Sequence, residues 1–540
     1  MTRVAPCLPL LLLISISAVL ARFPDALLRL QHSLAPKKDE FLETRLPIHH
    51  EGGVNLTHRT LRRFANRKVD RFHVKGTSIP HVNFDVGDSW SGLLPISADP
   101  YETRKLFFWY FPPTAKGNEN DLIFWTNGGP GCSSLAGFLQ ENGPISWQYG
   151  QAKPTPNSLS WTNLGHMLWV EQPVGTGFSQ GVPNIHNEIE LAAQLVGFFQ
   201  QFLNIFSELK GKNFYLTGES YAGLYLPYLA DYIFSNPSLL DLKVQGIWLG
   251  SPVLADDVIS FEVPSVNFVH RNENVFAFNQ SFLAHIDQVA DSCHYTSYLS
   301  EYLTYPPPPA PFPLPGASTE ADPGCDVWTE IAIAAITLNP AFNIFRIFDM
   351  PPILWDVLGL PGTSPQIQVQ PVYFNDPKVK AAIHAPADVE WTECVAVASV
   401  FAASGDTSQS PLYEVLPRVI AHGARTVVVT GLADFVLISE GTRIGIQNMT
   451  WSGKQGFQSA PKPDSFIVDG VGAFGTVQSE RGLTFYEVAI TGHMYVTCLA
   501  FLLVGGPSEN VSLGLGRIPQ FNPPAAFQSM QYLLGVRATP

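Results

Sequence analysis

A mostly parallel α/β fold is predicted by short apolar segments that alternate with helical segments along this 540-residue chain. Each apolar segment is bounded by Gly, Pro or Asn and is apolar almost throughout, which is typical of strands buried on both faces of a sheet. Two other segments, 188–206 and 221–234, have apolar residues at helical spacing. Strands that alternate with helices favour a parallel sheet. The predicted strands are 106–110, 122–126, 167–170, 214–217, 246–249, 426–430 and 484–490.

The composition is that of a large globular body with few charges. Hydrophobic residues make up 46% of the chain and charged residues only 14%, which supplies a large core and does not fit intrinsic disorder. The formal net charge is −14. Contacts to phosphates need clustered Lys and Arg, so we expect no nucleic-acid partner.

The N-terminus has the features of a secretory signal peptide. Arg3 supplies the positive charge, residues 8–20 form an apolar run, and Ala21 ends an acceptable cleavage site, so the signal is predicted to be 1–21. The run is shorter than the ~20 apolar residues that a membrane-spanning helix needs. We therefore expect a soluble mature protein with no membrane span; a signal anchor is the alternative.

A basic segment follows the predicted signal. Residues 22–75 carry twice as many basic as acidic residues, whereas residues 76–540 are strongly acidic. The contrast indicates a pro-segment, 22–75, that docks on the acidic body by charge attraction. Arg62-Arg63 and Arg67-Lys68 are candidate processing points. An ordinary basic arm is the alternative, and N-terminal sequencing of the secreted protein would decide.

Cysteine and asparagine residues indicate an oxidising compartment of the secretory pathway. Cys7 lies in the predicted signal, and four of the other five cysteines could form two disulfides and leave one thiol. We expect a glycoprotein that is either secreted or vacuolar (lysosomal), with an oligomeric state that the sequence does not give. The Asn-x-Ser/Thr triplets that accept N-linked glycans are at Asn55, Asn279, Asn448 and Asn510.

Residues 255–370 differ from the rest of the chain. They include the proline-rich stretch 305–316, which cannot be a regular helix or a central strand, and Cys293 and Cys325 bracket that stretch. We interpret the region as an insertion that forms a lid over a site. A surface excursion without a functional role is the alternative.

The segment Gly218-Glu-Ser-Tyr-Ala-Gly223 joins a predicted strand to a predicted helix. This is the context of a nucleophile elbow, a tight turn that exposes a Ser hydroxyl above the sheet. Ser220 is therefore the candidate nucleophile, and an ordinary Gly-rich turn is the alternative. The common form of the motif has Gly where this chain has Ala222, which is also small.

A Ser hydroxyl becomes a good nucleophile only when a base removes its proton, and in this arrangement an acid and then a His follow in chain order. Asp434 and His493 each come just after a predicted strand. Asp434 would orient the imidazole of His493, which would act first as base and then as acid. Glu440 is the rival for the acid, and His384 is the next choice for the base.

A second motif, WTNGGPGCSS at 125–134, also follows a predicted strand. Its consecutive glycines expose backbone N–H groups that can stabilise a tetrahedral oxyanion, and we expect Gly129 and Tyr221 to donate. A phosphate-binding loop is the alternative, but no Lys or Gly-Lys-Ser/Thr follows. The sequence has no dinucleotide motif and no closed zinc pattern, so we expect no cofactor and no metal.

These motifs and their order resemble the serine carboxypeptidase family, which includes carboxypeptidase Y and cathepsin A. The resemblance runs from about residue 80 to residue 500. It implies an α/β-hydrolase fold with a mostly parallel central sheet, a catalytic domain made of 76–254 and 371–540, and an inserted cap at 255–370. The matching segments are 125–144 (WTNGGPGCSSLAGFLQENGP), 168–179 (LWVEQPVGTGFS), 218–223 (GESYAG), 389–394 (VEWTEC), 492–494 (GHM) and the segment around Asp434.

The resemblance implies a serine-type carboxypeptidase that hydrolyses the C-terminal peptide bond of peptides and proteins through an acyl-enzyme at Ser220. In this family an Asn and two Glu bind the terminal carboxylate of the substrate; they correspond to Asn127, Glu141 and Glu219, with the Gly128 backbone beside them. A carboxylate can face two Glu side chains only if protons are shared, so we expect an optimum at about pH 4–6. The implied disulfides are Cys132–Cys394 and Cys293–Cys325, with Cys498 reduced.

The chain departs from the family pattern near its predicted site. Leu432 stands where an acidic residue is usual, and residues 250–252 and 495–498 also differ. These departures leave the side-chain preference open. Two other functions remain: an acyltransferase of the same fold, which has less need of Asn127 and the two Glu residues, and a non-catalytic protective or binding homologue.

Overall fold

The structure, a computed structural model, divides the chain into two units, 1–62 and 63–540. It describes residues 64–114, 118–316, 321–322, 324–339, 342–349, 356–359, 372–402, 405–493 and 518–540. The predicted signal 1–21, Asn55, Asn510 and Cys498 therefore lie outside the described residues. Within the described ranges, no helix combines the length and the apolarity that crossing a membrane requires.

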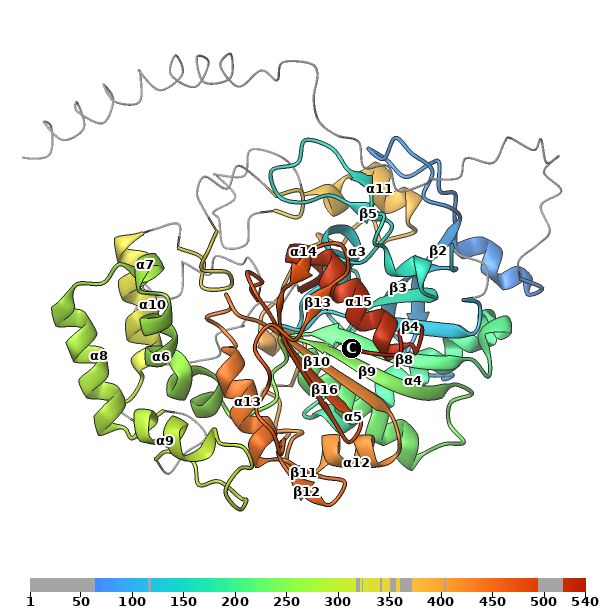
Figure 1. The fold of residues 1–540 in the computed structure, drawn as a ribbon. Helices are drawn as coiled ribbons and strands as arrows, with labels where there is room; N and C mark the ends of the chain where they lie inside the picture. The colour runs from blue at the N-terminus through green and yellow to red at the C-terminus, as the bar shows by residue number, and fades with distance from the viewer. Residues whose placement is uncertain are drawn as a thin grey trace, which may run out of the picture. The chain divides into compact units, whose positions relative to one another are not determined.

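Ten strands of the described chain form one sheet in the order β1-β2-β3-β7-β4-β8-β9-β10-β16-β15 (Figure 1). The six strands from β7 to β16 run parallel, and antiparallel strands flank them on both edges. The predicted parallel sheet is confirmed. The strands are β1 His73–Val74, β2 Ser89–Pro95, β3 Lys105–Phe111, β7 His166–Glu171, β4 Asp121–Thr126, β8 Asn213–Glu219, β9 Lys243–Gly250, β10 Arg425–Gly431, β16 Leu483–Val488 and β15 Gly475–Glu480.

Every predicted strand is present, because the central strands are buried on both faces. In β9, Ile247 and Leu249 pack into the core on one face, while Trp248 packs into the core on the other face. Helices α4 (Glu188–Ile205), α5 (Ala222–Ser235) and α12 (Val415–Ala421) belong to the first core, and α3 (Ser134–Gln140) and α15 (Pro523–Leu533) belong to the second. One predicted boundary is too long: the strand predicted to reach residue 490 ends at Val488.

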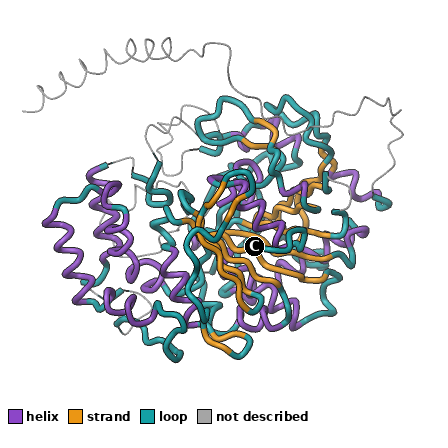
Figure 2. The backbone as a smooth tube through the Cα atoms, in the orientation of Figure 1, coloured by secondary structure: helices purple, strands orange, loops and turns teal. Residues whose placement is uncertain are grey.

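The chain between β9 and β10 contains a helical region with its own apolar core, seen beside the strands in Figure 2. This core also includes Ala433, Phe435, Ile438 and Ile444, which lie just after β10. The insertion therefore packs directly on the segment that carries Asp434. Its helices are η4 Val258–Glu262, α6 Val263–Arg271, α7 Glu273–Phe276, α8 Gln280–Ser292, α9 Tyr295–Tyr302 and α10 Val327–Leu338.

Short elements complete the described chain. The helical ones are η1 Arg67–Phe72, η2 Trp161–Asn163, η3 Ser207–Leu209, η5 Tyr373–Asn375, α11 Pro377–Ala382, η6 Val397–Ser399, α13 Ser439–Asn448 and α14 Ile518–Phe521. The extended ones pair as β5 (Ile145–Ser146) with β6 (Thr155–Pro156), β11 (Thr450–Trp451) with β12 (Lys454–Gln455), and β13 (Ile467–Val468) with β14 (Gly472–Ala473).

Residues 64–75, the end of the range predicted as a pro-segment, are built into the body. Strand β1 pairs with β2, and Phe64 and Phe72 are each only 5% exposed in the core. A cut at residue 75 would remove a strand and these core side chains. The processing point Arg67-Lys68 lies within η1, and Arg62-Arg63 lies outside the described residues.

Candidate active site

Ser220 lies in the tight turn between β8 and α5. Its backbone has a φ of 58°, in the left-handed region, and its side chain is only 1% exposed. The turn needs small neighbours: a Cβ added at Gly218 would lie 2.4 Å from the carbonyl oxygen of Thr126 and 2.8 Å from the Cβ of Ala222. The chain therefore tolerates Ala222 because residue 218 is glycine. A strained, crowded serine between a parallel strand and a helix is the geometry of a nucleophile elbow.

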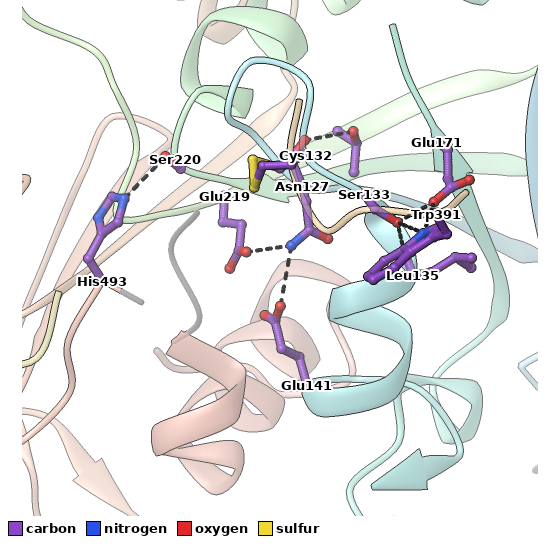
Figure 3. Close-up of a disulfide and its surroundings, with 12 residues drawn as sticks. Asn127, Cys132, Ser133, Leu135, Glu141, Glu171, Glu219, Ser220, Trp391 and His493 are labelled. Carbon is purple, nitrogen blue, oxygen red and sulfur yellow. Dashed lines mark hydrogen bonds between the residues drawn. A yellow bond between two sulfur atoms is a disulfide. The ribbon is translucent and has the colours of Figure 1, made fainter. Parts of the chain in front are cut away.

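The three predicted triad side chains meet. His493 Nε2 is 3.1 Å from Ser220 Oγ, and His493 Nδ1 is 2.8 Å from Asp434 Oδ2 (Figure 3 shows the Ser220–His493 contact). The second carboxylate oxygen, Asp434 Oδ1, accepts the backbone N–H groups of Val436 and Leu437 at 2.8 and 2.9 Å. Burial raises the pKa of Asp434, and the adjacent imidazole opposes that rise. This arrangement can hold the imidazole with Nε2 turned toward the hydroxyl.

The two rival residues lie elsewhere. Glu440 forms an ion pair with Arg271 and accepts from Asn267, so it ties α13 to α6 of the insertion. His384 lies against Gly92 of β2, and burial lowers its pKa. Neither residue belongs to the hydrogen-bonded group around Ser220.

The loop after β4 runs directly beside the elbow. A Cβ added at Gly128 would lie 2.4 Å from the backbone nitrogen of Tyr221, so only glycine lets the two segments approach this closely. Gly129 follows with a φ of 114°. Among the described residues, the N–H groups of Gly129 and Tyr221 donate to no other group. The predicted oxyanion donors are therefore adjacent and available.

The predicted carboxylate-binding residues form one buried group beside the serine (Figure 3). Trp125 Nε1 donates to Asn127 Oδ1 at 2.8 Å, which turns the amide nitrogen toward the two acids. Asn127 Nδ2 then lies 2.7 Å from Glu219 Oε1 and 3.5 Å from Glu141 Oε1. Both Glu side chains are at most 4% exposed. The structure thus brings together all three residues that were predicted from far-apart positions.

Two comparisons place this geometry among known proteins. The family model for serine carboxypeptidase matches residues 80–297 and 363–499. The chain is 41% identical over 491 residues to a probable serine carboxypeptidase of Arthroderma benhamiae, with 87% of both chains covered. It is 38% identical over 503 residues to serine-type carboxypeptidase F of Aspergillus niger, covering 88% of this chain and 89% of that protein.

The chain belongs to the serine carboxypeptidase family. Among solved structures, the prohormone-processing carboxypeptidase Kex1 of Saccharomyces cerevisiae superposes with a TM-score of 0.60 at 22% identity, covering 79% of this chain and 92% of that chain. That likeness supports the fold, an α/β-hydrolase fold with a helical insertion. The large parallel sheet agrees with it.

Both disulfides implied by the carboxypeptidase resemblance are present. Cys132–Cys394 joins the loop after β4 to a segment 262 residues away, and Cys293–Cys325 closes the proline-rich part of the insertion. Around the first bridge, the N–H of Val395 donates to the oxygen of Gly131 and the N–H of Ser133 to the oxygen of Glu393. The candidate oxyanion loop is therefore fixed to the distant segment on both sides of its disulfide.

One buried acid in this carboxypeptidase site was not predicted. Glu171 ends β7 and is only 1% exposed, and its carboxylate accepts from Ser133 Oγ, from Phe178 N and from Trp391 Nε1 at 3.1 Å (Figure 3). Burial raises its pKa to about 7, against these donors. Glu171 ties the candidate oxyanion loop to two other segments. The sequence feature that could have indicated Glu171 is a single acidic residue at the end of an otherwise apolar strand.

A segment of the insertion, 342–349, was also missed. The N–H of His493 donates to the oxygen of Phe345, whose ring centroid lies 5.9 Å from that of the imidazole. The N–H of Ile347 donates to Ala433 O, and the oxygen of Ile344 accepts from Phe435 N. The insertion therefore braces the loops of both His493 and Asp434, in addition to any role as a lid.

Proposed function

We propose that this carboxypeptidase removes the C-terminal residue of peptides and proteins through an acyl-enzyme on Ser220. The observation that carries the proposal is the buried Asn127–Glu141–Glu219 group beside a Ser–His–Asp triad. A hydrolase without exopeptidase specificity has no use for an amide and two carboxyl groups at that place. Membership of the serine carboxypeptidase family agrees with this function.

In the mechanism, the hydroxyl of Ser220 attacks the carbonyl carbon of the last peptide bond while Nε2 of His493 takes its proton. The N–H groups of Gly129 and Tyr221 stabilise the oxyanion that forms. His493 gives the proton to the leaving amine, and the terminal residue departs. Water, activated by the same imidazole, then hydrolyses the acyl-enzyme and frees Ser220. Asp434 keeps its charge and holds the imidazole in the tautomer that this cycle requires.

The terminal carboxylate of the substrate binds to Asn127 and the two Glu side chains. An ionised substrate carboxylate meets Glu141 and Glu219 favourably only while protons lie between the three carboxyl groups, which acidic solution supplies. Binding therefore weakens as pH rises, and we propose an optimum of about pH 4–6. This weaker binding should appear as a KM that increases with pH for substrates with a free C-terminus.

Amidation of the substrate tests this role. For an N-blocked dipeptide, kcat/KM should fall about 100-fold when the C-terminal carboxylate becomes an amide, since each hydrogen bond to a charged group contributes about 1.5–3 kcal/mol. In Asn127→Ala the same pair of substrates should differ less than fivefold, because the amide that binds the terminal carboxylate is gone and Glu141 and Glu219 lose the partner that orients them. Release of the terminal amino acid or amino-acid amide is followed at pH 5. Equal use of both substrates by the wild type would contradict exopeptidase recognition.

The buried acids predict how stability depends on pH. Burial raises the pKa of Glu171 to about 7 and that of Glu262 to about 8, both above the ordinary 4.5. The folded state therefore holds more protons than the unfolded state between pH 4.5 and 8, so stability is full below pH 4.5 and is lost as pH rises through 7 and 8. One pKa unit is about 1.4 kcal/mol, which makes the Glu171 share on the order of 3 kcal/mol.

Thermal unfolding at constant ionic strength checks this dependence. We expect Tm to be several degrees lower at pH 8 than at pH 4.5. Because Gln does not titrate, Glu171→Gln should make the decrease of Tm between pH 4.5 and 7 smaller. The decrease that comes from Glu262 should remain. A Tm that stays constant or rises across this range would contradict the assignment.

The chain passes through the secretory pathway in this proposal. Two disulfides in the described chain fit an oxidising compartment. Asn279 is exposed, and its Oδ1 caps α8, which leaves its amide nitrogen for a glycan. Asn448 is half-buried and accepts from Phe312 N, so its glycan is the less accessible of the two. The leader ends before residue 64, and Arg62-Arg63 is the processing point.

A further inference from the structure

A second buried acid lies behind the nucleophile elbow, where the proposed mechanism does not use it. Glu188 is the first residue of α4 and its side chain is fully buried. Among the described residues, no N–H or hydroxyl donor reaches either of its carboxyl oxygens. Its side-chain partner is another acid, the carboxyl group of Asp406. Two carboxyl groups can be hydrogen-bonded to each other only when one of them carries a proton.

Asp406 connects this pair to the residue that follows the nucleophile. Its Oδ2 accepts the hydroxyl of Tyr221 at 2.8 Å, and its Oδ1 accepts the N–H of Ser408 at 2.9 Å. Ser408 Oγ in turn accepts the backbone N–H of Glu188 at 2.7 Å. The segment 405–410 is thus attached to the start of α4 through both backbone and side chains.

Tyr221 also contacts a second tyrosine, Tyr225 on α5. Its ring lies edge-on to that of Tyr225, with centroids 5.3 Å apart. Tyr225 is fully buried. Glu188, Asp406 and the two tyrosines therefore form one group of side chains beside the nucleophile turn, in which Glu188 and Tyr225 are fully buried and Asp406 and Tyr221 are half-buried.

We propose that Glu188 and Asp406 share one proton and act as a positioning pair that holds Tyr221, and with it the oxyanion donor next to Ser220. The proton on Glu188 is donated to Asp406, and the charge left on Asp406 accepts the hydroxyl of Tyr221. Loss of the shared proton places a second negative charge, that of the fully buried Glu188, beside the half-buried Asp406, and their repulsion separates 405–410 from α4. The tyrosine then loses its acceptor. This inference rests on the proposed role of the Tyr221 N–H.

The charges around the pair support this interpretation. Besides each other, the acids face the hydroxyl groups of Tyr221, which precedes α5, and of Tyr225 and Tyr228 on α5; all three have raised pKa values, so these groups stay neutral in the working range. The nearby cation, Arg418, faces Tyr228 and is bound to Asp231. Burial, followed by Asp406, raises the pKa of Glu188 well above its usual range. Nothing described in the surroundings neutralises a second negative charge.

The experiment uses an N-blocked amino-acid ethyl ester, which forms the same acyl-enzyme but has no terminal carboxylate for Glu141 and Glu219. In the wild type we expect kcat to fall on the alkaline side. In Glu188→Gln the amide donates to Asp406 at every pH, so the alkaline limb should move up by at least one pH unit while kcat at pH 5 stays within threefold. Glu188→Ala removes the donor to Asp406, so kcat should fall about 10-fold at pH 5 with KM unchanged. This loss is smaller than the roughly 10²–10³-fold decrease in kcat that follows removal of an oxyanion donor itself.

Glu190→Gln is the matched control, because Glu190 lies on the same turn of α4 but is exposed and pairs with His186; its kcat profile should equal that of the wild type. If Glu188→Gln does not fold, Asp406→Asn replaces it, because the asparagine amide can donate to Glu188 at every pH. An unchanged alkaline limb in the folded Gln or Asn variant, or a wild type without such a limb, would overturn the positioning role. A wild type that hydrolyses neither the ester nor a blocked dipeptide would instead overturn the proposed function.

Discussion

Replacing Ser220 with alanine should lower kcat for a blocked dipeptide about 10⁶-fold at pH 5, with KM changed less than threefold. The hydroxyl is the atom that forms the acyl-enzyme, so its removal leaves only the oxyanion donors and substrate binding to accelerate attack by water. The carboxylate-binding group of Asn127, Glu141 and Glu219 stays intact, which preserves KM. Release of the free amino acid, measured with enough enzyme to detect residual turnover, checks the prediction.

Two histidine variants, His493→Ala and His384→Gln, are the controls for this result. His493→Ala should cost about as much as Ser220→Ala, because the nucleophile and its base act as one unit. His384→Gln, at the other candidate base, should leave kcat within threefold, since His384 lies against β2. A serine-directed phosphonate should label the wild type and spare Ser220→Ala. More than 1% residual activity in Ser220→Ala would assign the chemistry to another residue.

The sequence predicts the middle of the sheet better than its edges. Strands β4, β8, β9 and β10 are covered on both faces, and burial on both faces requires the continuous apolar runs that the prediction depends on. Strand β2 (SWSGLLP), next to the two-residue edge strand β1, contains Ser, Gly and Pro, and edge strand β15 (GTVQSE) has mostly half-buried or exposed residues. Such strands are held by pairing to a neighbour, which no local pattern records.

The same division applies to the candidate site. The elbow and the glycine loop could be predicted from short stretches of sequence, because a tight turn and a close backbone approach require small residues at neighbouring positions. Asp434 and His493 follow from chain order and strand ends. Glu171 also ends a strand, but its partners are distant along the chain, and so are those of Phe345 and of the Glu188–Asp406 pair, so no local pattern indicates what these residues do. Leu432, the departure from the family pattern, is partly exposed and leaves the triad geometry intact.

Replacing Asp434 with asparagine should lower kcat about 10⁴-fold without loss of the fold. The surroundings decide how the new amide lies. One oxygen of Asp434 accepts the N–H groups of Val436 and Leu437, so the amide oxygen of asparagine must stay on that side. The amide nitrogen then faces His493 Nδ1, which must accept, and the ring proton moves to Nε2. An imidazole protonated at Nε2 cannot take the proton of Ser220.

A wrong tautomer of His493 and a mere loss of charge at Asp434 have different consequences. If charge alone mattered, Asp434→Ala and Asp434→Asn would have equal effects, whereas the tautomer argument predicts that Ala, which leaves the ring free to turn either nitrogen to Ser220, retains at least as much activity. Glu440→Gln is the control for removing a buried acid near the same strand; because Glu440 binds Arg271, it should lower Tm and leave kcat within threefold. A loss in Glu440→Gln comparable to that in Asp434→Asn would mean that the insertion's attachment to the body, and not the orientation of His493, limits the reaction.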